Sequence, residues 1–477
     1  MTLRNYLDRL DAEGRLTRIT EPISKTYEIA ALLKQLEPRP VIFENVIESE
    51  YRVMGNLFCS KQDFADYFGI SVAEIIPLLR RAIEERKHPP FHPPRARGGK
   101  RGGTLSARRL NARGGAPCQE VVHLNPDLDS LPIPLHFEGD GGPYITAGVF
   151  VVKHPEYGQN LDYHRSMQFS PTEMAIRVVK GRHFYKFLED LGQVDVAVCV
   201  GNSPNVLAAA AISVEIGIDE LTIANALEPL HLVRAKTVDL MIPAEAEFVL
   251  EGTVYRDRTH AEGPFVDLTE TQDVIRQEPV FEVKAITHRK NPIWQALLPG
   301  ALEHKLLMGM PREPTIFREV NEVVKCLDVN INPGGCSWLH AIVQIDKQHE
   351  DDGKKAIRAT FAGHRSCKHV YVVDKDIDIY DPLQVEWAMA TRFQGDRDLI
   401  VLGKEPGSSL DPSAEPGTKL TSKMGFDLTA PVGNAHRHYE KVPYPHVDLS
   451  RFIRNKTQSR TPKAGLRPGA ESQRIKN

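Results

Sequence analysis

Several common signatures are missing from this sequence of 477 residues. No apolar run approaches the roughly 20 residues that a membrane-spanning helix needs. The charged first residues have no apolar core of the kind that a signal peptide carries. The six cysteines are scattered without C-x-x-C spacing, which argues against a disulfide scaffold or a zinc knuckle. These absences favour a cytoplasmic protein with reduced thiols and no membrane partner.

The charge of the chain and its lack of nucleotide-binding motifs exclude further classes of protein. The formal net charge is −3, with 26% charged and 41% apolar residues, which is ordinary for a soluble globular protein and indicates no nucleic-acid partner. Neither the G-x-G-x-x-G dinucleotide fingerprint nor a P-loop is present. The length allows two or three domains.

The chain changes character twice along its length. The first part alternates helix and strand patterns: an apolar helix face over residues 3–10, a buried strand over 40–46, and a capping box at Ser71 and Glu74. Residues 89–115 are rich in Pro, Gly and Arg and predict a solvated connector. From about 117 to 310 strand patterns dominate, which suggests a barrel or curved sheet.

Two helices are predicted within this strand-rich part. One opens with the cap-like Ser170-Pro171-Thr172-Glu173 and ends at Gly181, and the other begins near Pro204. After about 315 the pattern is α/β again, with a strand over 369–379 and a helix over 382–393. Beyond Lys441 the sequence is polar and basic, and the last twenty or so residues are expected to be disordered.

Four central motifs carry residues with possible chemistry: Asn160–Arg165, Gly181–His183, Gly217–Glu220 and Glu262–Asp267. Each has an ordinary structural explanation when taken alone, such as a cap, a turn, or an acid at a helix start. Together, Asn, His and Glu are ligands that suit Mn2+ or Mg2+. An arginine with two carboxylates can bind an anionic substrate and exchange a proton with carbon.

These motifs resemble the UbiD decarboxylase family. The resemblance covers residues 3–430 in order, and the matching runs include GDGGPYITAG (139–148), VDLMIPAEAEFVLEG (238–252), EGPFVD (262–267) and KHVYVVDKDIDIYD (368–381). It implies an α/β fold with a β-rich centre, in which an N-terminal α/β domain precedes a flavin-reductase-like split β-barrel and a C-terminal α/β domain that supports a homodimer or homohexamer. The corresponding ranges are 1–116 with the connector, 117–312, 313–441, and a flexible basic tail over 442–477.

The same resemblance implies prenylated FMN, supplied by a separate flavin prenyltransferase, with a divalent metal (Mn2+ before Mg2+) and a potassium ion. The metal ligands would be Asn160, His183 and Glu220, and the catalytic group would be Arg165, Glu262 and Asp267. Arg165 and the three metal ligands would also line the cofactor site, together with Thr146, Arg182, Ile212 and Lys368.

The chain departs from the family pattern at three places, one of which is the stretch Ala226-Leu-Glu-Pro, two residues shorter than usual. Asp267 stands where many relatives have Glu, so its link to Arg165 must be closer or bridged by water. The segment Ala210–Ser213 has alanines where some members have serines, so backbone carbonyls or Ser213 would have to bind potassium or phosphate there.

The implied activity is the reversible, non-oxidative decarboxylation of an aromatic, heteroaromatic or α,β-unsaturated carboxylic acid through a covalent adduct with prenylated FMN. Glu262 would protonate the carbanion after CO2 has left. The histidines His304, His340 and His436 are candidates for contacting a ring substituent, which favours a hydroxylated or heteroaromatic acid.

Two alternatives stay open, and a third is rejected. An FMN-dependent oxidoreductase of the split-barrel type would be reduced by NAD(P)H. A nucleic-acid-binding protein would use the basic stretch 95–113 and bind in a salt-dependent way. The run Asp374-x-Asp376-x-Asp378 is not a calcium loop, because Ile379 and Val385 stand where Gly and Glu are needed.

Overall fold

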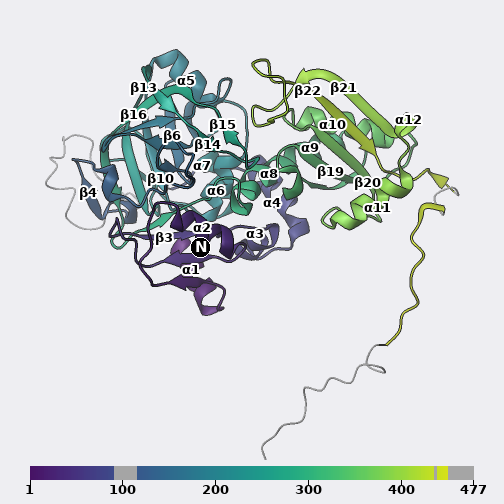
Figure 1. The fold of residues 1–477 in the computed structure, drawn as a ribbon, viewed down its shortest axis with the longest axis horizontal. Helices are drawn as coiled ribbons and strands as arrows, with labels where there is room; N and C mark the ends of the chain where they lie inside the picture. The colour runs from purple at the N-terminus through teal and green to yellow at the C-terminus, as the bar shows by residue number, and fades with distance from the viewer. Residues whose placement is uncertain (91–114, 434–437, 449–477) are drawn as a thin grey trace, which may run out of the picture.

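The computed structural model describes residues 1–90, 115–433 and 438–448. The predicted order of an α/β part, a β-rich centre and a second α/β part is confirmed (Figure 1). Most of the predicted connector and nearly all of the basic tail lie outside the described residues. None of the helices in the described ranges is long and apolar enough to cross a membrane.

The N-terminal part packs helices on a small mixed sheet. The predicted first helix is α1, whose buried residues Leu3, Tyr6, Leu7 and Leu10 form one face, and Thr2 caps it. The capping box at Ser71 and Glu74 is present before α4. The helices are α1 (Leu3–Ala12), α2 (Glu28–Leu36), α3 (Lys61–Phe68) and α4 (Ile75–Glu84), and the strands are β1 (Thr17–Ile19), β2 (Val41–Phe43) and β3 (Arg52–Gly55).

A strand from the centre of the chain completes this sheet. The order is β1-β2-β3-β17, and β17 (Ile293–Gln295) lies parallel to β3. Trp294 in β17 is among the largest fully buried side chains. The N-terminal part is therefore bound to the central part through backbone hydrogen bonds and a shared core.

The centre is a nine-stranded sheet, the counterpart of the predicted split barrel. Its path is β5-β8-β9-β16-β13-β10-β6-β7, and β4 pairs with β16. The strands are β4 (Val121–His123), β5 (Tyr144–Ile145), β6 (Val149–His154), β7 (Gly158–Tyr163), β8 (Ser166–Gln168), β9 (Glu173–Ile176), β10 (Gln193–Val200), β13 (Phe248–Glu262) and β16 (Arg276–His288).

Four helices and two hairpins accompany this sheet. The helices are α5 (His183–Leu191), α6 (Pro204–Ala211), α7 (Glu220–Leu227) and α8 (Leu302–Gly309). The hairpins pair β11 (Leu232–Arg234) with β12 (Met241–Pro243), and β14 (Phe265–Val266) with β15 (Gln272–Asp273). The helix predicted from Pro204 is confirmed as α6, and its alanine-rich run is almost entirely buried.

The helix predicted between Ser170 and Gly181 is wrong. Residues 173–176 form the strand β9, which pairs with both β8 and β16, and α5 begins only at His183. Met174, Ala175 and Ile176 are buried in the sheet, so burial and strand pairing outweigh the local cap signal. His183 consequently lies at the start of a helix and not at the end of one.

The C-terminal part is a five-stranded sheet between helices. Its order is β18-β19-β20-β22-β21. Residues 341, 343 and 345 of β19 pack with α9 and α10, whereas Ile342 packs with α11 on the opposite face. The strands are β18 (Cys326–Asn330), β19 (His340–Ile345), β20 (His369–Asp374), β21 (Leu399–Pro406) and β22 (Leu420–Asp427), and the helices are α9 (Glu313–Asn321), α10 (Asp352–Gly363), α11 (Pro382–Arg392) and α12 (Gly395–Asp398).

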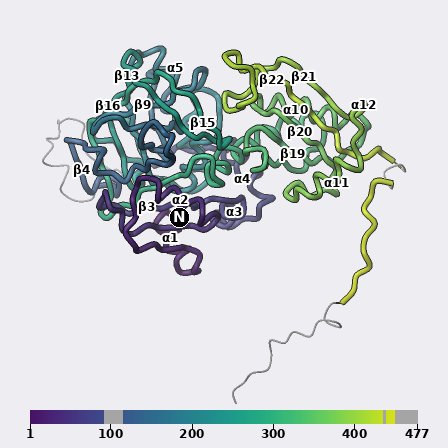
Figure 2. The backbone as a smooth tube through the Cα atoms, viewed as in Figure 1, coloured from purple at the N-terminus to yellow at the C-terminus, as the bar shows by residue number. Residues whose placement is uncertain are grey.

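The two larger parts lie side by side. Figure 2 shows the C-terminal part beside the central part, with α4 in the region between them. The predicted strand over 369–379 ends at Asp374, and the predicted helix over 382–393 is α11.

Arg392, at the end of α11, stabilises the chain beyond β20. Its guanidinium is fully buried and pairs with Asp374 at 3.0 Å and Asp376 at 2.5 Å. We expect Arg392→Met to lower the free energy of unfolding by about 3–5 kcal/mol, because the buried carboxylate of Asp374 would lose its ion-pair partner. Urea unfolding at pH 7 measures the change, with the exposed Arg358→Met as control. A loss equal to that of the control would contradict this role.

Candidate active site

A single arginine gathers three carboxylates at one end of the central sheet. Arg165 lies in the break between β7 and β8. Its Nε and Nη2 donate to the two oxygens of Glu262 at 2.8 and 3.0 Å, its Nη1 donates to Asp267 at 2.5 Å, and its Nη2 donates to Asp273 at 2.9 Å. The predicted group of Arg165, Glu262 and Asp267 therefore meets in space.

The three carboxylates come from one continuous stretch of chain. Glu262 ends β13, Asp267 follows β14, and Asp273 ends β15. Asp267 reaches Arg165 directly, so the shorter side chain at this position is accommodated by a close contact and needs no water bridge. The cation also stacks over the ring of Phe265, at 4.5 Å from the ring centre.

Asp273 was not predicted from the sequence. It accepts hydrogen bonds from both Arg165 and Arg276. Burial alone would raise the pKa of Asp273, but the hydrogen bond from Arg276 and the charge of Arg165 outweigh it and lower the pKa to about 2. The only sequence signal for Asp273 as a site residue was the spacing of three residues between it and Arg276. Such pairs are common in surface turns.

Glu262 is the most enclosed member of this group. Its side chain is fully buried, and the hydroxyl of Tyr144 donates a hydrogen bond to it at 3.0 Å. For Arg165, burial acts to lower the pKa, but the hydrogen bonds to Glu262 and the charges of the carboxylates raise it above its ordinary value. The arginine is therefore permanently charged, and Glu262 is buried beside it in this structure.

A close backbone approach fixes the position of Glu262. Gly141, in the GDGGPYITAG run, donates from its N–H to the carbonyl of Pro264 at 2.8 Å. A Cβ at Gly141 would lie 2.2 Å from the carbonyl oxygen of Gly263. Only glycine fits this contact, which joins two motifs that are far apart in the sequence.

The three predicted metal ligands form a second group. Asn160 lies in β7, and its Oδ1 accepts a hydrogen bond from Nδ1 of His183 at 2.8 Å. Glu220, the first residue of α7, accepts a hydrogen bond from the N–H of Leu161 at 2.7 Å. Both His183 and Glu220 lie at helix starts, so the positive ends of two helix dipoles point toward this group.

The chemistry of this second group fits a divalent cation. Burial raises the pKa of Glu220 well above its usual value. A buried carboxylate without a cation is costly, and a metal ion would reverse that cost. In the described residues no group of three or more His, Cys, Asp or Glu is arranged to hold a metal ion, so an asparagine oxygen would be needed as a third ligand here.

Family models match most of the chain. The models for the N-terminal, Rift-related and C-terminal domains of 3-octaprenyl-4-hydroxybenzoate carboxy-lyase, UbiD, match residues 7–83, 109–302 and 305–428. The chain belongs to the UbiD family. It is therefore a carboxy-lyase. The domain boundaries predicted at 116/117, 312/313 and 441/442 stay predictions.

Curated relatives match this UbiD-family chain over nearly their whole length. Anhydromevalonate phosphate decarboxylase of Methanocaldococcus jannaschii is 37% identical over 90% of this chain and 97% of its own. The enzyme of the same name from Methanothermobacter thermautotrophicus is 39% identical over 91% of this chain and 98% of its own.

Solved structures agree with this assignment. The UbiD-class enzyme HmfF from Pelotomaculum thermopropionicum, in complex with FMN, superposes with a TM-score of 0.87 at 33% identity, over 95% of this chain and all of its own. An evolved dimeric form of that enzyme, in complex with prFMN, gives 0.83 at 32% identity, with the same coverage. These UbiD-class structures hold flavin cofactors, and this chain shares their fold.

The remaining predicted cofactor residues are spread over three places. Thr146 lies between β5 and β6 and donates to the carbonyl of Leu297 at 2.7 Å. Ile212 caps α6 and is buried, and Arg182 directly precedes His183. Lys368 lies in the C-terminal part, where it pairs with Asp411 at 2.9 Å. Only Arg182 among these is adjacent to the predicted metal ligands in sequence.

The predicted substrate histidines do not form one group. His304, on α8, accepts the N–H of Gly300 at its Nδ1, and burial and the charge of Arg165 lower its pKa while Asp267 acts to raise it. It is therefore close to the arginine group. His340 instead contacts His369 at 2.8 Å in the C-terminal sheet. His436 lies outside the described residues.

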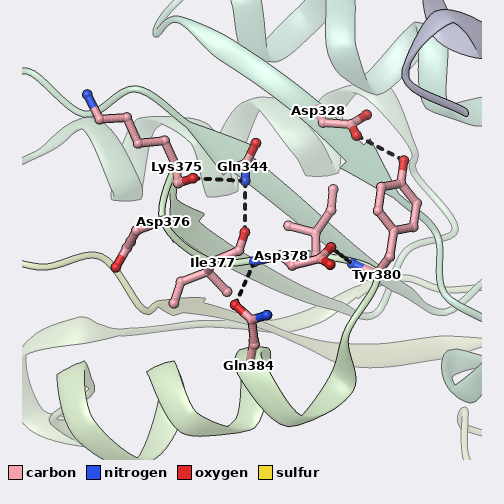
Figure 3. Close-up of a pocket in the computed structure, with 9 residues that line it drawn as sticks. Asp328, Gln344, Lys375, Asp376, Ile377, Asp378, Tyr380 and Gln384 are labelled. Atoms are coloured by element: carbon pink, nitrogen blue, oxygen red, sulfur yellow. Dashed lines mark hydrogen bonds between the residues drawn. The ribbon is translucent and has the colours of Figure 1, made fainter. Parts of the chain in front are cut away.

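A pocket in the C-terminal part is separate from both groups. Its polar groups hydrogen-bond to one another: Tyr380 donates to Asp328 at 2.9 Å, and the side chain of Gln344 donates to the carbonyl of Ile377 at 2.8 Å (Figure 3). Asp378, which also lines it, accepts the N–H of Tyr380. With Asp374 and Asp376 paired to Arg392, the three alternating aspartates have structural partners and do not converge on a cation.

The depressed pKa of Asp273 predicts a pH-dependent contribution to stability. Its folded pKa of about 2 lies below the ordinary value of 3.8, so the contribution is complete above about pH 4 and is lost as pH falls toward 2. We expect Asp273→Asn to lower the free energy of unfolding most at pH 7. The difference in unfolding free energy between this variant and wild type should be smaller at pH 3. Urea unfolding across this range measures it, with the exposed Asp257→Asn as control. A gap that does not depend on pH would contradict the ion pairing.

Proposed function

We propose that this chain decarboxylates a small, unsaturated acid that carries a phosphate group, with prenylated FMN as cofactor. The observation that carries the reaction type is the buried group of Arg165, Glu262 and Asp267. The substrate class is supported by the curated relatives, which are named for anhydromevalonate phosphate. Loss of water from a hydroxy acid leaves a carbon–carbon double bond, so the proposal selects the α,β-unsaturated member of the predicted classes.

The aromatic preference loses its support in this comparison. It rested on three histidines, and of the two that the structure describes, His304 and His340, only His304 has an electrostatic contact with the arginine group. The alternative of an FMN oxidoreductase is also not favoured, because the chain belongs to a family of carboxy-lyases. An unsaturated acid needs no ring-binding histidines, which agrees with their dispersal.

The cofactor supplies what side chains lack, an electron sink for the pair that is left when the bond to the carboxylate breaks. Asn160, His183 and Glu220 would hold a divalent metal, Mn2+ or Mg2+, and potassium would be a further ion. UbiD-class relatives with bound FMN and prFMN support the flavin cofactor of this proposal.

The arginine group would perform the proton chemistry. A guanidinium has five N–H donors, and four hydrogen bonds to carboxylates are formed, which leaves one N–H of Nη1 to orient the substrate carboxylate. After CO2 has left, protonated Glu262 would deliver its proton to the carbon that had carried the carboxylate. Asp267 and Asp273 would hold Arg165 in place, and solvent would restore the proton on Glu262.

The activity test uses holoenzyme that has been co-expressed with a flavin prenyltransferase. We expect turnover of anhydromevalonate phosphate, and none of hydroxybenzoic or furoic acids. Glu262→Gln should retain flavin but lower kcat by about 10²–10⁴, because the general acid is lost. CO2 release and the absorbance spectrum measure the two effects.

Glu282→Gln, a change on the surface side of β16, is the matched control and should keep activity. Turnover of aromatic acids alone would refute the substrate class. Near-normal turnover by Glu262→Gln would refute the proton donor.

Removal of the proposed metal ligands should act on cofactor content. We expect Asn160→Ala, His183→Ala and Glu220→Gln each to lower the divalent metal and flavin that copurify with the protein, because each removes one ligand of three. Elemental analysis and flavin absorbance measure this, with the exposed His349→Ala as control. Full metal occupancy in all three variants would place the metal elsewhere.

A further inference from the structure

Three cationic side chains lie near the ring of His364, where the central and C-terminal parts adjoin, and none of them is paired with a carboxylate in the described residues. Arg182 caps the start of α5, Arg312 ends the short helix Met310–Arg312, and Lys423 lies in β22. The charges of all three act on the ring of His364. Across the described ranges, none of the three forms an ion pair with Asp or Glu, although Glu405 lies close enough to Lys423 to raise its pKa slightly.

Arg312 is the centre of this cluster, which we call the junction cluster (Arg182, Arg312, His364 and Lys423). Its Nε is buried and has no hydrogen-bond partner, and its guanidinium stacks over the ring of Trp338 at 5.3 Å. Burial, and then the charge of Arg182, lower the pKa of Arg312 to about 9. Arg312 as a whole is half-buried and Arg182 is exposed, but a guanidinium whose Nε is buried without a partner beside a second cation is unfavourable unless an anion compensates it.

Lys423 and His364 lie in the same positively charged surroundings. Lys423 is buried, its Nζ donates to the carbonyl of Arg365 at 2.5 Å, and burial lowers its pKa. His364 donates from Nε2 to the carbonyl of Trp338 at 2.8 Å. Burial, followed by the neighbouring cations, lowers the pKa of His364 to about 3 despite that hydrogen bond, so the ring is neutral.

The junction cluster borders both groups of the candidate active site. Arg182 directly precedes His183, one of the proposed metal ligands. On the other side, Trp338 packs with Leu268, the residue after Asp267. An anion bound by the junction cluster would therefore lie near both groups of the candidate active site. It would contact residues of the central part and of the C-terminal part.

We propose that Arg182, Arg312 and Lys423 bind a phosphate monoester at this junction. This proposal deepens the proposed function and rests on it for the identity of the phosphorylated substrate. A phosphate monoester carries close to two negative charges at pH 7 and several acceptor oxygens, which match two guanidinium groups and an ammonium group. Two compounds could supply it: the acid substrate, or the flavin.

Binding of inorganic phosphate to the full chain tests the site without any turnover. Isothermal titration calorimetry should show saturable binding to wild type, weakened about 10- to 100-fold in Arg312→Met because a charge-assisted hydrogen bond is lost. The matched control is Arg318→Met, an arginine in α9 that is largely exposed. Equal phosphate affinity in wild type and Arg312→Met, or no binding to wild type, would overturn the proposal.

Arg312→Lys and Lys423→Met serve if Arg312→Met fails to fold, as judged by circular dichroism. Arg312→Lys keeps the charge but loses the guanidinium's paired donors, so it should bind phosphate with intermediate affinity. Lys423→Met should weaken binding as Arg312→Met does. Unchanged affinity in both would overturn the site.

The holoenzyme distinguishes the two sources of phosphate. If the substrate supplies it, Arg312→Met keeps its flavin and raises KM for anhydromevalonate phosphate about 10- to 100-fold, with little change in kcat. If the flavin supplies it, the variant loses flavin, and KM is unchanged in the fraction that retains it. Unchanged flavin content together with unchanged KM would overturn the proposal. Phosphate binding at Arg312 without turnover of anhydromevalonate phosphate would refute the proposed function alone.

Discussion

The charge of Arg165 organises the candidate active site. One guanidinium joins the break between β7 and β8 to the end of β13 and to the hairpin of β14 and β15. That hairpin has only two residues in each strand, so its own backbone pairing is small. A buried cation that is shared among several carboxylates is strongly coupled to each of them. The positions of Glu262, Asp267 and Asp273 therefore depend on the arginine more than on local structure.

Much of the fold could be predicted from the sequence because its signals are local. Hydrophobic periodicity in the sequence predicts the apolar faces of α1 and α11 and the buried strand β2. The folded protein has all three. The segment after Ser170 shows the limit of this reasoning. Its cap-like residues describe a helix start, but Met174 and Ile176 gain more from burial between β8 and β16 than a helix would provide. Helix propensity is a weak preference, and in this segment the tertiary contacts of the sheet outweigh it.

The site residues that belong to family motifs were predicted from the sequence, and those outside the motifs were not. Arg165, Glu262 and Asp267 meet as the family resemblance implied. Asp273 could not be predicted, because an aspartate in a polar hairpin has no periodicity and its partner is 108 residues away. The same holds for Arg312. An unpaired arginine is visible only when every neighbouring side chain is placed, since a sequence cannot show that a carboxylate is missing from its surroundings.

The two charged regions differ in how far their charges are balanced, and this difference bears on catalysis. Around Arg165 the carboxylates are offset by Arg165 itself and by Arg276, which also pairs with Asp273, whereas no carboxylate is paired with the junction cluster in the described residues. A substrate with a carboxylate and a phosphate would therefore gain most of its electrostatic attraction at its phosphate end. Binding energy at that remote phosphate could offset the cost of placing the substrate carboxylate beside Asp267, which is how remote contacts lower the barrier of a reaction instead of only tightening binding.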